Sequence, residues 1–349
     1  MKTKSLRSFY FLLPALLLVS CTSRQNPLEK EGSPQQASSQ KTDERPFGLL
    51  IHGGAGRYSR DFFNDQRKKH WKAQLNKARD VGYAVLEKGG TSLDAVQAAV
   101  EVLEQDTLFN AGKGAVMNRE GHHQLDASIM EGHRRRAGAV ACVAHIAAPI
   151  KAARWVMDST RHVLLAGSDA DAWAAKTGLT HVPNAYFTTV RTKRHWQQRY
   201  GKSHSPGSLP KSKGTVGAVA LDQDGHLAAA TSTGGMTGKL PGRVGDSPLI
   251  GSGTYASKRV AVSATGSGEY YIRGALAYDV HARVCYRDQA LEAAARTVIH
   301  QNLHQMGGKG GLIALDSAGN ITAPFNTGGM LRSYCFSDGR ANALLYQDD

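Results

Sequence analysis

Residues 214–235 read GTVGAVALDQDGHLAAATSTGG, a pattern that predicts a β-hairpin. Residues 215–221 form an apolar run with strand character, and the Asp-Gln-Asp-Gly sequence at 222–225 is typical of a turn. Residues 226–231 then run back as the partner strand. The middle of the chain is therefore predicted to contribute antiparallel strands.

The segments on either side of this hairpin also come in pairs. Before it, we expect a strand over 47–51, helices over 65–87 and 91–104, strands over 124–130 and 137–143, and helices over 150–157 and 169–176. After it, we expect a strand over 260–264, helices over 268–283 and 288–306, and a hairpin from 311–315 and 321–325. Paired helices and hairpins favour an α+β sandwich of antiparallel sheets covered by helices over a doubly wound parallel sheet.

The N-terminus has the pattern of an export signal. Lys2, Lys4 and Arg7 precede an apolar stretch over 9–19, which is shorter than the roughly 20 residues that span a bilayer. The stretch ends in Leu-Val-Ser-Cys, which resembles a bacterial lipobox. We expect a signal peptide over 1–20, a lipidated Cys21 and a flexible polar tether over 21–46. The alternative is an ordinary secretory signal.

Residue 22 bears on the destination of such a lipoprotein. Thr22 follows the cysteine, where an aspartate would be the alternative signal. By resemblance to Gram-negative lipoproteins, this favours the periplasmic face of the outer membrane. The cell envelope is therefore the expected location of the protein.

One internal segment supplies half of the net charge of +14. Residues 191–213 hold seven lysines and arginines and no acid, namely Arg191, Lys193, Arg194, Arg199, Lys202, Lys211 and Lys213. A polyanion binder is one explanation, which would give salt-sensitive binding. Aromatic residues for base stacking are limited to Trp196 and Tyr200. We therefore interpret 191–214 as a solvated basic linker and expect no nucleic-acid partner.

Other motifs for ligand binding are incomplete. The Gly234–Lys239 segment has the wrong spacing for a phosphate loop. The Asp-Gln-Asp-Gly turn begins like a calcium loop, but nothing downstream completes it. Cys142, Cys285 and Cys335 do not suggest a disulfide framework, and the histidines lack metal-binding spacing.

The Gly214–Thr215 bond offers a specific chemistry. Without a Cβ, Gly214 lets the threonine oxygen approach its carbonyl carbon, so that the acyl group can move from nitrogen to oxygen. Hydrolysis of the ester would free the amino group of Thr215, whose ordinary pKa of about 7.7–8.0 suits a general base. Thr215 could then act as both nucleophile and base.

Further motifs strengthen this interpretation. They are IHGGAG at 51–56, LFNAGKGAV at 108–116, LDASIMEG at 125–132, LPGRVGDSPLIGSGTYA at 240–256 and ATGSGE at 264–269. Together with 214–235 they resemble the plant-type asparaginase and isoaspartyl peptidase family of N-terminal-nucleophile hydrolases. The resemblance implies a four-layer αββα sandwich and one catalytic domain over 47–349. Cleavage would divide it into an α subunit over 47–214 and a β subunit over 215–349, and two such αβ units would form a dimer.

The resemblance also implies catalytic roles. Thr215 would be the nucleophile, with Thr233 hydrogen-bonded to it. Thr265 and the backbone N–H of Gly266 would form the oxyanion hole.

For substrate binding, the resemblance implies that Arg243 holds the α-carboxylate and Asp246 the α-ammonium, with help from Gly268. Asn110 would support the active site and the bound substrate. The geometry of a guanidinium independently suits a carboxylate, and an aspartate three residues later supplies the opposite charge. A surface ion pair without a ligand is the alternative.

One loop resembles a sodium site built from backbone carbonyls. The carbonyls implied are those of Leu103, Glu104, Asp106, Phe109, Ala111 and Lys113. The Asp106-Thr107 pair departs from the Cys-Pro that the family pattern would have there. No other cofactor is expected.

The substrate follows from the head group that this pocket recognises. Free asparagine and a β-aspartyl dipeptide share an α-amine, an α-carboxylate and a β-amide, so that one pocket could serve both. We expect an isoaspartyl peptidase with asparaginase activity, working through a β-aspartyl ester. A glycosylasparaginase on the same scaffold and a non-catalytic periplasmic binding lipoprotein are the alternatives.

Overall fold

The computed structural model describes residues 46–58, 60, 63–200 and 214–349. The predicted signal peptide, Cys21 and nearly all of the tether lie outside these residues, as does the second half of the predicted linker. Within the described part, no helix combines the length and apolar character needed to cross a membrane.

The strands of the described residues form two sheets. The larger sheet has the order β12-β11-β1-β5-β6-β2-β3-β4, and the smaller has the order β10-β9-β8-β7. The larger sheet comprises β1 (Gly48–Gly56), β2 (Leu125–Glu131), β3 (Ala137–Val143), β4 (Leu164–Ala166), β5 (Val216–Leu221), β6 (Leu227–Thr233), β11 (Gly329–Phe336) and β12 (Ala341–Leu344). The smaller comprises β7 (Thr254–Ala256), β8 (Val260–Gly266), β9 (Gly310–Asp316) and β10 (Ile321–Thr322). Neighbours are antiparallel except for the β3–β4 pair.

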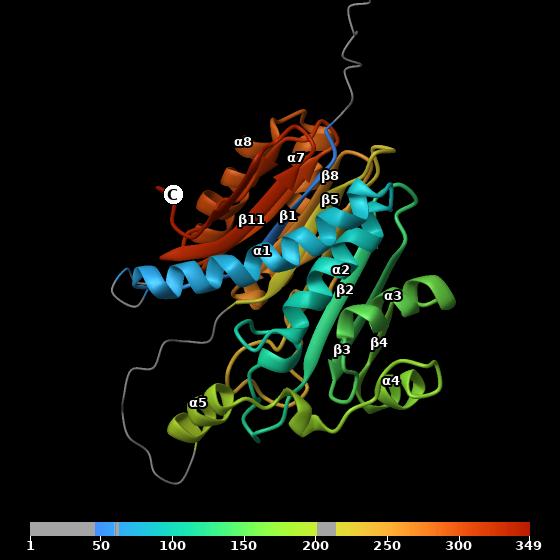
Figure 1. Ribbon diagram of the computed structural model, residues 1–349, viewed down its shortest axis with the longest axis vertical. Helices are drawn as coiled ribbons and strands as arrows, with labels where there is room; N and C mark the ends of the chain where they lie inside the picture. The colour runs from blue at the N-terminus through green and yellow to red at the C-terminus, as the bar shows by residue number, and fades with distance from the viewer. Residues whose placement is uncertain (1–45, 59, 61–62, 201–213) are drawn as a thin grey trace, which may run out of the picture. The chain divides into compact units, whose positions relative to one another are not determined.

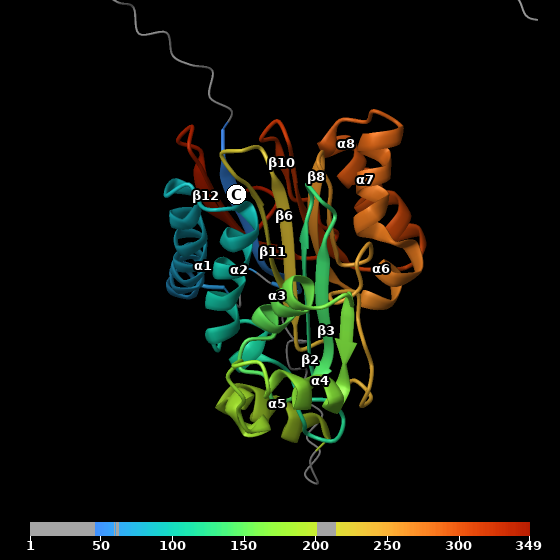
Figure 2. The same ribbon diagram turned by 90° about the vertical axis from the view of Figure 1, so that its right-hand side faces the viewer.

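Helices cover the outer face of each sheet (Figures 1 and 2). On the larger sheet lie α1 (Asp65–Glu87), α2 (Ser92–Gln105) and α3 (Pro149–Ser159), with α4 (Gly167–Ala174) beside β3. On the smaller sheet lie α7 (Leu276–Tyr286) and α8 (Leu291–Thr297), preceded by α6 (Gly268–Gly274). Because β1, β5 and β6 also pack against β8 and β9, the layers run helix, sheet, sheet, helix. This confirms the predicted αββα sandwich.

The β5–β6 hairpin lies at the centre of this sandwich. Its register pairs Val216 with Ser232 and Leu221 with Leu227. Along β5, Val216 and Ala218 face the core beneath the helices, whereas Val219 faces the core between the sheets. Alternation between two apolar cores explains why β5 is apolar throughout.

Several predicted elements have the expected bounds. Helix α1 matches the prediction at both ends, and α2 begins after Thr91, whose side chain accepts a hydrogen bond from the N–H of Asp94.

Two of the predicted C-terminal helices are interrupted. The 268–283 helix breaks at Ala275, which has a left-handed backbone with φ 46°. The 288–306 helix begins at Leu291 and becomes a π-helix over Val298–Leu303.

The predicted basic linker requires a correction. Its first half belongs to helix α5 (Val190–Tyr200), and residues 201–213 lie outside the described part. The helix has tertiary partners that composition does not reveal. Thr192 is buried, the indole N–H of Trp196 donates to the carbonyl of Asn118, and Arg191 donates to the carbonyls of Thr107 and Gly114.

Candidate active site

Thr215 lies immediately before β5, and its side chain is directed to the end of β6. The residue is 6% exposed, and its hydroxyl donates a hydrogen bond of 3.1 Å to Thr233 Oγ1. Thr233 Oγ1 in turn accepts a hydrogen bond of 3.0 Å from the N–H of Gly235. Hairpin pairing therefore brings the two threonines together, as predicted.

The HGGAG motif of β1 packs its backbone against Gly214. A Cβ at Gly54 would lie 2.7 Å from the carbonyl carbon and oxygen of Gly214. A Cβ at Gly214 would lie 2.5 Å from Thr265 Oγ1 and 2.9 Å from the backbone nitrogen of Ala55. Gly214 is thus required by close packing as well as by the proposed chemistry of its carbonyl.

Thr265 and Gly266 approach the Gly214–Thr215 bond from the smaller sheet. They end β8, and Thr265 Oγ1 accepts a hydrogen bond of 3.2 Å from the N–H of Ala55. A Cβ at Gly266 would lie 2.5 Å from the carbonyl oxygen of Lys309. The predicted oxyanion residues therefore lie beside the Gly214–Thr215 bond, at the meeting point of the two sheets.

A cavity of about 550 Å³ opens over these residues. Its lining includes Gly214, Thr215, Thr233, Arg243, Asp246 and Gly266 among the predicted site residues. It also includes Arg57, Arg199, Tyr270, Lys309 and Asn326, none of which was predicted to belong to the site. Residues from both predicted subunits thus share one cavity.

Arg243 and Asp246 both line the cavity, but they do not pair with each other. The Nε and Nη2 atoms of Arg243 contact Glu269 Oε1 at 2.9 and 2.8 Å. Asp246 is 3% exposed, and its Oδ2 atom has no hydrogen-bond partner among the described residues. A buried acceptor beside a cavity is suited to a donor from a ligand. Gly268 packs against both side chains, since a Cβ there would lie 2.8 Å from Asp246 Oδ1.

Burial dominates the electrostatics of Asp246. It raises the pKa of this carboxyl to about 7, and the carboxylates of Glu269 and Asp126 add to the increase. The guanidinium of Arg243 acts in the opposite direction. A ligand ammonium would stabilise the ionised carboxylate.

Asn110 supports the loop that follows Thr233. Its amide nitrogen donates to the carbonyl of Gly235 at 2.7 Å, and its amide oxygen accepts from the N–H of Val116 at 2.9 Å. Both ends of the side chain are therefore used within the fold. The predicted role of Asn110 at the bound substrate stays a prediction.

In the predicted sodium loop, two glycines lie directly against backbone carbonyl oxygens of the same segment. A Cβ at Gly112 would overlap the carbonyl oxygen of Glu104, and one at Gly114 would overlap that of Phe109. Closely gathered backbone oxygens fit an oxygen-liganded cation. The guanidinium of Arg191 already donates to two other carbonyls of this loop, at Thr107 and Gly114.

The candidate calcium-like turn has a structural role. Asp222 accepts hydrogen bonds from the N–H groups of Ser92 and His226. These bonds fix the start of α2 and the β5–β6 turn, which supports the turn interpretation.

His52 lies close to the site without providing a base. Burial lowers the pKa of its ring to about 3, although the backbone of Thr215 partly counteracts this. Its Nε2 atom hydrogen-bonds with Ser263 Oγ at 3.0 Å. Among the described residues, Thr215 Oγ1 hydrogen-bonds to Thr233 and to no histidine, lysine or carboxylate.

A buried ion pair lies beneath the loop that carries Arg243 and was not predicted from the sequence. Lys239 Nζ lies 3.7 Å from Asp126 Oδ2, and both side chains are fully buried. A Cβ at Gly235 would lie 3.0 Å from Lys239 Nζ and 3.3 Å from Arg243 Nη1, so the pair lies under the Arg243 loop. Asp126 within the LDASIMEG motif is the sequence signal that could have indicated this pair, because a buried acid requires a partner.

We predict that Lys239→Met destabilises the fold by about 3–5 kcal/mol, because it leaves Asp126 buried without a cation. Urea denaturation would measure this loss. The double variant Asp126→Asn/Lys239→Met is the matched control, since it removes both charges. It should regain a large part of the stability, and equal losses in the two variants would contradict the prediction.

The fold and site together define a hydrolase of the N-terminal-nucleophile class, with a threonine at the start of a central strand in an αββα sandwich. Comparison with known proteins supports this class. The family model described as Asparaginase matches residues 45–345. The chain is 44% identical to the isoaspartyl peptidase of Escherichia coli strain K12, over 86% of this chain and 96% of that protein. It is 41% identical to the mouse isoaspartyl peptidase/L-asparaginase, over 81% of this chain and 86% of that protein. The chain belongs to this asparaginase family.

Proposed function

We propose that this protein is an isoaspartyl peptidase and L-asparaginase that is activated by cleavage of its own Gly214–Thr215 bond. One observation carries the proposal. Thr215 Oγ1 contacts Thr233 but no side-chain base among the described residues, and it lies in a cavity that also holds Arg243 and Asp246. A nucleophile without a side-chain base can use its own amino group.

Activation would proceed by an acyl shift. Thr215 Oγ1 attacks the carbonyl carbon of Gly214, the C–N bond breaks, and an ester forms. Water then hydrolyses the ester, leaving a carboxylate on Gly214 and a free amine on Thr215. The hydroxyl of Thr265 is adjacent to Gly214 and would stabilise the oxyanion.

Substrate hydrolysis would repeat this chemistry. The amine of Thr215 accepts the hydroxyl proton, and the oxygen attacks the β-carbonyl carbon of the substrate. The amide C–N bond breaks, the leaving amine takes a proton, and a β-aspartyl ester remains on Thr215. Water releases aspartate. Arg243 and Asp246 hold the α-carboxylate and α-ammonium, while Thr265 and Gly266 face the developing oxyanion.

A panel of substrates tests the activity. Purified protein, with two chains verified by intact mass, should release leucine from β-Asp-Leu and ammonia from asparagine. Lack of activity on both would refute the proposal. Release of N-acetylglucosamine from glycosyl-asparagine, without activity on β-Asp-Leu, would favour a glycosylasparaginase. An intact single chain that binds aspartate would favour the binding lipoprotein.

Asp246 predicts a pH dependence for the binding of the product L-aspartate. The carboxylate form of Asp246 is needed to bind the ammonium, and the pKa of Asp246 in the protein without ligand is about 7. Affinity should therefore fall about tenfold per pH unit as the pH decreases below 7. Inhibition constants between pH 5 and 8 would measure this. Constant affinity over that range would contradict the prediction, and Asp246→Asn should bind weakly at every pH.

We further propose a bound sodium ion, a dimer of αβ units and a lipid anchor. The carbonyl oxygens of Glu104 and Phe109, which lie against Gly112 and Gly114, support the ion, and thermal stability that depends on sodium over potassium would test it. Sedimentation velocity would test the dimer. The Leu-Val-Ser-Cys pattern supports the lipid anchor, and Thr22 after it supports the periplasmic face of the outer membrane. Labelling with palmitate should be lost in Cys21→Ala, and fractionation would identify the membrane.

A further inference from the structure

The active-site cavity has more positive than negative side chains. Arg57, Arg199, Arg243 and Lys309 line it, and Asp246 is the acid in the lining. Glu269 pairs with Arg243, whereas no ion pair among the described residues involves Arg57, Arg199 or Lys309. The head group of asparagine needs one cation and one anion. The remaining cations are therefore available to a second anionic group.

The order of strands in the larger sheet separates these charges. Strand β5, which follows Thr215, lies between β1 and β6. The loop with Arg243 and Asp246 follows Thr233 at the end of β6, whereas Arg57 follows the end of β1. Arg57 and the substrate head-group residues therefore lie on opposite flanks of the nucleophile.

In the smaller sheet, Lys309 and Asp246 are likewise on opposite sides of the strand that ends in Gly266. Gly266 ends β8, which lies between β7 and β9. Lys309 directly precedes β9, and its carbonyl accepts a hydrogen bond of 2.9 Å from the N–H of Ser267. Asp246 lies on the β7 side, since a Cβ at Gly253 would lie 2.6 Å from its carbonyl oxygen. Because β9 packs against β1 and β7 packs against β6, Lys309 lies on the same flank as Arg57.

Arg199 does not share this flank. It comes from α5, and its guanidinium carbon lies 5.7 Å from the ring centre of Tyr200. Tyr200 packs against Gly238, in the loop after β6. Arg57, in contrast, is held by a tight turn. The N–H of Tyr58 donates to the carbonyl of Gly56 at 3.0 Å, and the buried Tyr58 ring packs against Gly329.

We propose that Arg57 and Lys309 bind the carboxylate of the leaving amino acid in a β-aspartyl dipeptide, an assignment that rests on the proposed function. With the head group at Arg243 and the scissile carbonyl at Thr215, the leaving group extends toward the opposite flank. A dipeptide has a free carboxylate there. Asparagine releases ammonia, and a glycosylamine leaving group is uncharged. The cavity therefore selects β-aspartyl dipeptides over asparagine and over glycosyl-asparagine.

The test compares β-Asp-Leu, its C-terminal amide and asparagine as substrates of the wild type, Arg57→Ala, Lys309→Ala and the double variant. Wild-type kcat/KM should be about 10- to 100-fold higher for β-Asp-Leu than for the amide, as expected for a charge-assisted hydrogen bond. Each single variant should reduce this ratio roughly 3- to 10-fold, since exposed charges are partly screened. Activity on asparagine should stay within about twofold, because ammonia makes no such contact.

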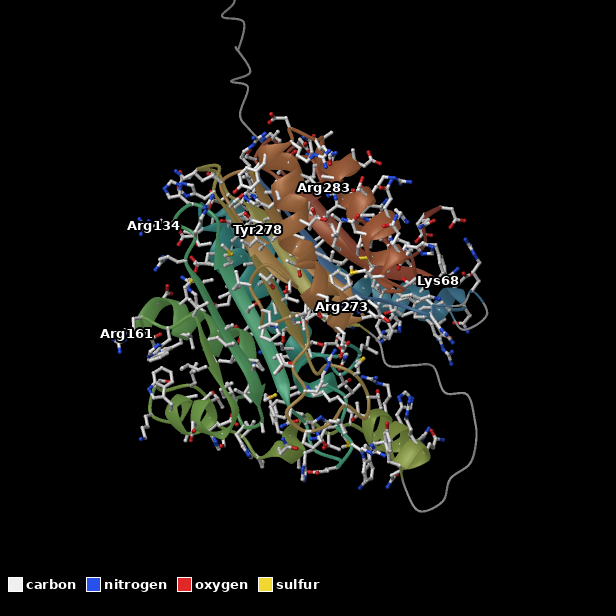
Figure 3. All side chains as sticks on the ribbon, turned by 180° about the vertical axis from the view of Figure 1, so that it is seen from behind. Lys68, Arg134, Arg161, Arg273, Tyr278 and Arg283 are labelled. Carbon is white, nitrogen blue, oxygen red and sulfur yellow. The ribbon has the colours of Figure 1, made fainter. Side chains whose placement is uncertain are left out.

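Arg161→Ala is the matched control, because this exposed arginine projects from the chain after α3, away from the sheets (Figure 3). It should leave the ratio unchanged. An unchanged ratio in the double variant, or an equal loss on asparagine, would overturn the assignment. If the cleaved wild type hydrolyses all three substrates without preference, the proposed function stands and this inference is wrong. If it hydrolyses none, the proposed function itself is wrong.

Discussion

Thr215→Ala is expected to produce a single uncleaved chain with at least about 10⁴-fold lower activity. The substitution removes the oxygen that attacks Gly214 during activation and the substrate afterwards. It also leaves Thr233 Oγ1 without the donor that lies 3.1 Å away. Intact mass would measure the cleavage, and release of leucine from β-Asp-Leu would measure the activity.

Thr215→Ser is the matched control for this prediction. Serine keeps the nucleophilic oxygen and loses the methyl group that restricts χ1. The variant should cleave itself and turn over substrate, both more slowly than the wild type. Normal cleavage of Thr215→Ala at the same bond would contradict the proposed mechanism.

Thr265→Val is expected to lower kcat by about 100- to 1000-fold, the usual effect of losing one oxyanion donor. Valine preserves the shape of the side chain but has no hydroxyl. Because Thr265 Oγ1 also accepts the hydrogen bond from Ala55, a stability loss of about 1–3 kcal/mol should accompany the kinetic effect. Steady-state kinetics, normalised to the cleaved fraction, would separate turnover from activation.

Thr265→Ser retains the hydroxyl and should keep the larger part of the activity. Full kcat in properly folded, cleaved Thr265→Val would exclude the oxyanion role. A loss confined to self-cleavage would restrict the role of Thr265 to activation.

Local patterns predicted the regular elements well where one face of each is buried. Helix α1 and the β5–β6 hairpin follow from apolar spacing, and Thr91 marks the start of α2 by its capping chemistry. Strands β11 and β12 were not predicted. Their polar residues include Arg332, which is buried and donates to the carbonyls of Met330 and Tyr346. Such tertiary partners override the local hydrophobic pattern.

Composition misled the interpretation of residues 190–200. A basic segment without acids is typical of a solvated linker, but α5 uses Arg191 and Trp196 to satisfy backbone carbonyls elsewhere in the chain. The break at Ala275 is similar, because an alanine gives no local signal for a left-handed backbone. Both features depend on contacts that are distant in sequence.

Residue type and local spacing were sufficient to identify Thr215 as the candidate nucleophile, with the glycine before it. They also identified the ordered motifs that supply Thr233, Arg243, Asp246 and Thr265. How these residues meet depends on contacts between segments that are distant in the chain. Adjacent strand ends bring Thr233 and Thr265 to the same bond. The same contacts pair Arg243 with Glu269, place Lys239 and Asp126 beneath its loop, and bring Arg57 and Lys309 to the opposite flank. Strand order and burial set these relations, and neither can be read from local sequence.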